Sequence, residues 1–182
     1  MRHKFILVYF IITLLVITGC NTYKSLDEAI QSKWKSPIKV LLIDKMKNTV
    51  VFLDQDQYVF NTFKKNGDKY IYSTDGEDGW TFTADSGLTP FLFRSLNTKT
   101  AGNVFWGAIK TDKDVETVEV TYTNINASDS QIKVKIPVVD NVFIGYPTRD
   151  FFDSDLTLSG EWKLSAKAFD EDGNIVAAVT GF

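Results

Sequence analysis

Short runs of β-branched and aromatic residues, separated by turn signals, recur along most of the chain and constrain its fold more than any other feature. Ile38–Asp44 and Thr49–Asp54 are two such runs, and in residues 132–136 the apolar residues alternate strictly with lysines. Such alternation is typical of antiparallel strands that bury one face and leave the other in water. Because the turn signals recur about every 10 residues, the pattern predicts a β-sandwich.

A single helix is predicted ahead of these strands. Ser25 and Glu28 have the spacing of a capping box, in which each side chain satisfies a backbone N–H of the first turn. One apolar helix face follows, formed by Leu26, Ala29, Ile30 and Trp34. Pro37 forces the residue before it out of the helical region. We therefore expect one short helix from about Leu26 to Lys35.

The strand pattern divides the chain into two halves. Residues 85–102 are the least regular part, since Gly87 and Pro90 interrupt them. We expect residues 25–102 to form the helix and an antiparallel meander of about five strands, and residues 103–182 to form a β-sandwich. The predicted fold class is therefore mostly β, with one short N-terminal helix.

The N-terminus has the features of a secretory signal. Basic residues 2–4 precede an apolar run of 13 residues, Phe5–Ile17. A helix that crosses a bilayer needs roughly 20 residues, so this run indicates a signal peptide and not a membrane span.

Residues 17–20, Ile-Thr-Gly-Cys, resemble the lipobox of bacterial lipoproteins. The resemblance implies cleavage before Cys20, a diacylglycerol thioether on its sulfur and retention on the outer face of the cell membrane. We expect residues 1–19 to be the signal peptide and residues 20–24 a lipidated tether. The alternative is an ordinary signal peptide that happens to be followed by a cysteine.

The amino-acid composition excludes several kinds of chemistry. Cys20 is the only cysteine and His3 the only histidine, so the chain after cleavage contains no histidine. Catalysis by Ser-His-Asp or Cys-His groups and zinc binding by histidine and cysteine are thereby excluded. Loss of Arg2 and Lys4 with the signal leaves 18 basic and 23 acidic residues, a formal charge of −5. This acidity argues against a nucleic-acid partner.

The second half resembles a known kind of module. Three segments are similar to immunoglobulin-like modules of Gram-positive surface lipoproteins: residues 106–120, 132–144 and 166–176. They include the Val-Glu-Val strand at residues 118–120 and the Asp-Glu-Asp-Gly-Asn turn at residues 170–174. The resemblance implies an immunoglobulin-like β-sandwich over residues 103–182, without the disulfide of antibody domains. The whole chain resembles small lipoproteins of Bacillus-like bacteria, and this resemblance implies no activity.

Two acidic turns are candidate cation sites. Asp170, Asp172 and Asn174 alternate like the start of a calcium loop, and residues 75–79 form a second acidic turn. The EF-hand pattern needs a glycine at its sixth position and a glutamate at its twelfth, and neither is present. We therefore expect two hairpin turns and neither a metal nor a cofactor.

Four aromatic residues are candidates for ligand binding. Phe151 and Phe152 are adjacent, so they cannot both face one side of a strand, and an exposed aromatic ring often marks a binding surface. Tyr72 and Trp80 lie in runs whose aromatic residues share one face of each strand, as a stacking platform for a sugar or a peptide requires. The alternative is that Phe151 and Phe152 are both tucked over the end of the sandwich, and that the strand faces bearing Tyr72 and Trp80 are buried.

The sequence thus predicts a lipid-anchored, extracytoplasmic binding or interaction module without catalytic activity. Its expected partners are the membrane, through the lipidated Cys20, and a protein or cell-wall component. One alternative is a carboxylate-based hydrolase of cell-wall glycans, which requires two acidic side chains about 5 to 9 Å apart. The other is an accessory subunit of a membrane complex.

Overall fold

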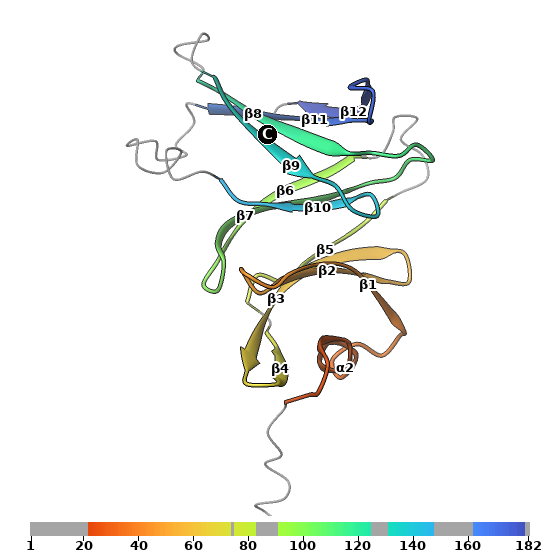
Figure 1. The fold of residues 1–182 in the computed structure, drawn as a ribbon, viewed down its shortest axis with the longest axis vertical. Coiled ribbons are helices and arrows are strands. Elements are labelled where there is room, and N and C mark those ends of the chain that lie inside the picture. The colour runs from red at the N-terminus through yellow and green to blue at the C-terminus, as the bar shows by residue number, and fades with distance from the viewer. Residues whose placement is uncertain (1–21, 74, 83–90, 125–130, 148–161, 181–182) are drawn as a thin grey trace, which may run out of the picture.

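The computed structural model describes residues 22–73, 75–82, 91–124, 131–147 and 162–180, which are mostly β (Figure 1). One helix, α2 (Leu26–Gln31), precedes all the strands. The strands are β1 (Ile38–Asp44), β2 (Thr49–Asp54), β3 (Gln57–Asn66), β4 (Lys69–Tyr72), β5 (Asp78–Thr81), β6 (Phe91–Thr98), β7 (Gly102–Ile109), β8 (Thr117–Asn124), β9 (Gln131–Pro137), β10 (Val142–Gly145), β11 (Trp162–Phe169) and β12 (Ile175–Thr180). The predicted fold class is confirmed.

Helix α2 begins where the capping pattern places it. The backbone N–H of Glu28 donates to the Ser25 hydroxyl at 3.1 Å, and the Glu28 carboxylate accepts from the backbone N–H of Lys24 at 3.1 Å. The helix ends four residues earlier than expected. The side-chain amide of Gln31 donates to the carbonyls of Trp34 and Ser36 at 2.8 and 2.7 Å, and these bonds hold the chain in a turn that replaces a further helical turn.

Strands β1 to β5 form one antiparallel sheet in the order β1-β2-β3-β4, with β5 paired to β3. Both β4 and β5 pair with β3, but with successive stretches of it: β4 with Phe63–Asn66, and β5 with Gln57–Phe60. Strands β4 and β5 therefore lie one after the other along β3, and the path along the sheet is interrupted between them. The expected meander of five strands is present with this one interruption.

The remaining strands form two sheets that face each other, in the orders β10-β7-β6 and β12-β11-β8-β9. The chain crosses from β9 to β10, which pairs with β7, and returns to pair β11 with β8. An immunoglobulin-like sandwich has this arrangement, with β6, β7 and β10 in the places of strands A, B and E, and β8, β9, β11 and β12 in the places of C, C′, F and G.

The expected boundary between residues 102 and 103 falls inside a hairpin. Strand β6 pairs with β7 along its whole length, from Phe91 opposite Ile109 to Thr98 opposite Gly102. The sandwich therefore begins with β6. The polar residues of this strand are the reason why the sequence pattern is irregular there. Gly102 adopts a φ of +74°, which suits the tight turn that joins the two strands.

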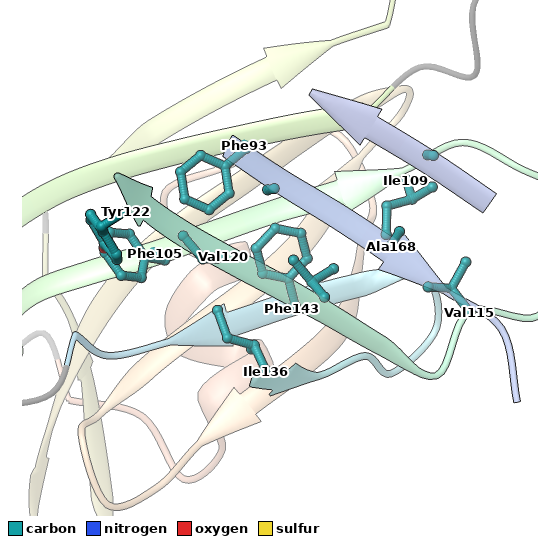
Figure 2. Packing of buried hydrophobic residues seen from close by; sticks show 12 residues of the cluster. Phe93, Phe105, Ile109, Val115, Val120, Tyr122, Ile136, Phe143 and Ala168 are labelled. Carbon is teal, nitrogen blue, oxygen red and sulfur yellow. The ribbon is translucent and has the colours of Figure 1, made fainter. Parts of the chain in front are cut away.

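The layers stack in the order α2, the β1–β5 sheet, the β10-β7-β6 sheet and the outer sheet (Figure 1). One apolar core separates each layer from the next. The β10-β7-β6 sheet is thus buried on both faces: on β7, Val104 and Trp106 point into the core shared with the β1–β5 sheet, and Phe105 and Ile109 point into the sandwich core. Figure 2 shows this sandwich core, in which Phe105 and Phe143 lie among side chains of the outer sheet.

Candidate functional site

The acidic turn of residues 75–78 uses its three carboxylates in three separate hydrogen-bond networks. Asp75 accepts the backbone N–H of Lys99 at 3.2 Å and both the backbone N–H and the hydroxyl of Thr100 at 3.0 and 3.1 Å. Partial desolvation alone would raise the pKa of Asp75, but these bonds and the charge of Lys99 outweigh it and hold the pKa below its usual value. Asp75 therefore fastens the turn to the β6–β7 hairpin.

Glu77 points to the other side of the sheet. It accepts the Tyr72 hydroxyl at 2.9 Å and the Asn61 side-chain amide at 3.1 Å, and the Trp34 indole N–H donates to the Tyr72 oxygen at 3.1 Å. Tyr72 is only 7% exposed, and burial raises the pKa of its hydroxyl. The structure therefore places Tyr72 in the core beneath α2, so the predicted surface platform does not include it.

Asp78 joins two layers. It accepts from the Arg94 guanidinium at 3.1 and 3.3 Å and from the indole N–H of the fully buried Trp106 at 3.0 Å. Because Asp75, Glu77 and Asp78 each accept hydrogen bonds from protein donors, the turn has a structural role. No group of three His, Cys, Asp or Glu side chains in the described ranges is placed to hold a metal ion.

The second acidic turn joins β11 to β12. Asp170 accepts the backbone N–H of Asn174 at 2.7 Å and its side-chain amide at 3.2 Å. These bonds hold the pKa of Asp170 below its usual value, with the backbone bond contributing most. Gly173 adopts a φ of +80° in this turn. The expected hairpin is confirmed.

Trp80 lies at the surface, on β5. It is 45% exposed, its cross-strand neighbour is Tyr58, and the Arg94 guanidinium carbon lies 5.8 Å from its ring centroid. Tyr58 in turn contacts Phe82 edge to face, with ring centroids 5.5 Å apart. Of the two described candidates, Trp80 is thus the one that a ligand can reach. We call Trp80, Arg94 and Tyr58 the Trp80 surface.

A second surface was not predicted. Ile43, Met46 and Val139 are 37%, 91% and 47% exposed, and all three line one hollow of about 370 Å³. The other lining residues are Leu42, Asp44, Lys45, Pro137 and Ile144. We call this feature the apolar hollow. It lies at the edge of the stack formed by β1 and β10, whereas the Trp80 surface lies at the edge formed by β5 and β6.

The other predicted residues, Cys20, Phe151 and Phe152, lie outside the described residues, so their roles remain predictions. Comparison with protein-family models, with curated proteins and with solved structures gives no match. Within the part of the chain that the structure describes, no helix has the length and hydropathy that a membrane span requires.

Proposed function

We propose that this protein is a lipid-anchored, extracytoplasmic interaction module without catalytic activity, and that the apolar hollow is the surface that contacts its protein partner. The observation that carries the proposal is the gathering of Ile43, Met46 and Val139 around one concavity. Single exposed apolar residues are normal on a protein surface, whereas a contiguous group beside a hollow is typical of an interaction site.

The energetics favour a partner that inserts an apolar side chain. Burying a side chain of the size of Ile, Met or Val gains about 1.5–3 kcal/mol relative to leaving it in water. A partner that covers the hollow gains most of this term at Met46, which is 91% exposed, and a smaller part at Ile43 and Val139, which are already more than half buried. Met46, at the turn between β1 and β2, has a flexible thioether side chain that adapts to the shape of a partner.

The N-terminal sequence supports the proposed location. The Ile-Thr-Gly-Cys motif of residues 17–20 is the kind of site at which a cysteine receives a diacylglycerol group. Stable anchoring takes two acyl chains, and a diacylglycerol thioether supplies both. The proposed tether of residues 20–24 is short, so a partner would be another membrane protein or a protein of the adjacent cell wall.

The location is tested with a Cys20→Ser variant of the full chain. We expect the wild-type protein to sediment with membranes and to be released only by detergent, and the variant to be released without it. A variant that stays in the membrane fraction to the same extent as the wild type would contradict lipid anchoring at this cysteine.

The contact surface is tested by placing a photo-cross-linking amino acid at position 46 of the full chain in its native membrane, with position 80 on the opposite edge as the matched control. We expect one protein to be captured from position 46 and not from position 80, and Val139→Asp to abolish this product. Equal capture from both positions, or capture of lipid alone, would contradict the proposal. Release of sugars from a cell-wall glycan by the purified chain would favour the hydrolase alternative.

A further inference from the structure

We infer that the Trp80 surface is a second binding site, and that it takes a neutral pyranose ring bearing a hydroxyl or acetamido oxygen next to its apolar face. This goes beyond the proposed function, because the site lies at the edge of the stack opposite the apolar hollow and binds a small saccharide instead of a protein.

The indole of Trp80 supplies an apolar stacking face. Trp106, one layer further in, is fully buried, whereas Trp80 is 45% exposed at the edge of its sheet. The aromatic rings of Tyr58 and Phe82 beside it hold this end of β5 in place. An indole has a flat, polarisable face, and the C–H bonds on one face of a pyranose ring match it in shape and polarity.

Arg94 supplies hydrogen-bond donors in a fixed orientation. Its Nε and Nη2 atoms donate to Asp78, which also accepts from the buried Trp106 indole. The Nη1 atom, with its two N–H donors, bonds to no acceptor in the described residues, and the side chain is 44% exposed. Because the guanidinium is already held over the Trp80 ring, with its carbon 5.8 Å from the ring centroid, a ligand that bonds to it loses little side-chain entropy.

The charge of the site favours a neutral ligand. Asp78 compensates the charge of Arg94, so the pair presents donors without a net positive charge. The full chain has a formal charge of −3, which repels an anionic polymer. A neutral hydroxyl or acetamido carbonyl accepts from Nη1 without this electrostatic repulsion. The geometry therefore favours a neutral hexose or N-acetylhexosamine over a uronic acid.

The test is a calorimetric titration of the full chain, held in a detergent without a sugar headgroup. The neutral probe is the tetrasaccharide of N-acetylglucosamine, and the anionic probe is tetragalacturonate. We expect the neutral probe to bind with a measurable heat and the anionic probe to bind at least about tenfold more weakly. Trp80→Ala should weaken neutral binding at least about tenfold. The matched control Ile175→Ala, at an exposed apolar residue of β12 that belongs to neither proposed surface, should leave it unchanged.

A second variant separates binding from folding. Arg94→Lys keeps a cation that can pair with Asp78 but removes the free Nη1 donors, so neutral binding should weaken several-fold while the near-ultraviolet circular dichroism stays unchanged. The inference is overturned if the neutral probe gives no heat at millimolar concentration or if tetragalacturonate binds more tightly. It is also overturned if folded Trp80→Ala and Arg94→Lys proteins bind as the wild type does.

Discussion

Replacing Asp78 with alanine removes a carboxylate that joins the β1–β5 sheet to both β6 and β7. The loss has two parts. The indole N–H of Trp106 is fully buried and would be left without its acceptor, which costs about 1–3 kcal/mol. The pair with Arg94 is half in water and contributes about 0–1 kcal/mol. We expect the free energy of unfolding to fall by about 2–3 kcal/mol, and Tm to fall by roughly 5–10 °C.

The assay is urea unfolding of the full chain, followed by tryptophan fluorescence. Glu119→Ala is the matched control, because Glu119 is as exposed as Asp78 and pairs with Lys133 at 2.9 Å. We expect this control to lose about 0–1 kcal/mol. Asp78→Asn should fall between the two, since an amide oxygen still accepts from Trp106. If Asp78→Ala loses no more than Glu119→Ala does, the reasoning about the buried indole is refuted.

Three further predictions concern packing and ionisation. Gly107→Ala should lower the free energy of unfolding by at least about 1–3 kcal/mol, because the new Cβ would overlap the backbone carbonyl oxygen of Leu92 and the Phe143 ring. Gly79→Ala should cost less, because its new Cβ meets only the flexible Gln57 side chain. Equal urea midpoints for the two variants would contradict this. The interactions that lower the pKa of Asp75 stabilise the fold above a pH of about 4, and this stabilisation is lost as the pH falls through the folded-state pKa. The free energy of unfolding should therefore fall more steeply with acid in the wild type than in Asp75→Asn. Because burial raises the pKa of Tyr72, its hydroxyl should ionise only above the ordinary pH range of tyrosine, when the protein unfolds. A Tyr72→Phe difference titration at 295 nm that shows an ordinary tyrosine transition would contradict this.

The fold was predictable wherever local pattern and tertiary packing agree. The alternation in residues 132–136 is that of β9, and Ser25 with Glu28 marks the start of α2. Strand β6 was missed as part of the sandwich because it is an edge strand, with exposed Arg94 and Ser95 in its middle, and so lacks the continuous apolar run of β7. The end of α2 was missed because side-chain bonds of Gln31 decide it.

The sites were less predictable, because they depend on which strands become edges. The spacing of the aromatic residues treats Tyr72 and Trp80 alike, yet the structure buries Tyr72 under α2 and leaves Trp80 exposed beside β6. The apolar hollow brings together residues almost 100 positions apart, such as Met46 and Val139, and no local pattern links them. The one available signal was Met46 itself, an apolar residue inside a turn of lysines.

The doubly buried sheet β10-β7-β6 has a consequence for how this chain unfolds. Val104 and Trp106 of β7 have their neighbours in one half of the protein, and Phe105 and Ile109 have theirs in the other. If either half opened alone, it would expose one whole apolar face of this sheet to water, at a cost proportional to the area uncovered. The two halves should therefore melt in a single transition, and a fragment cut from either side would behave as an aggregating half-protein instead of a domain.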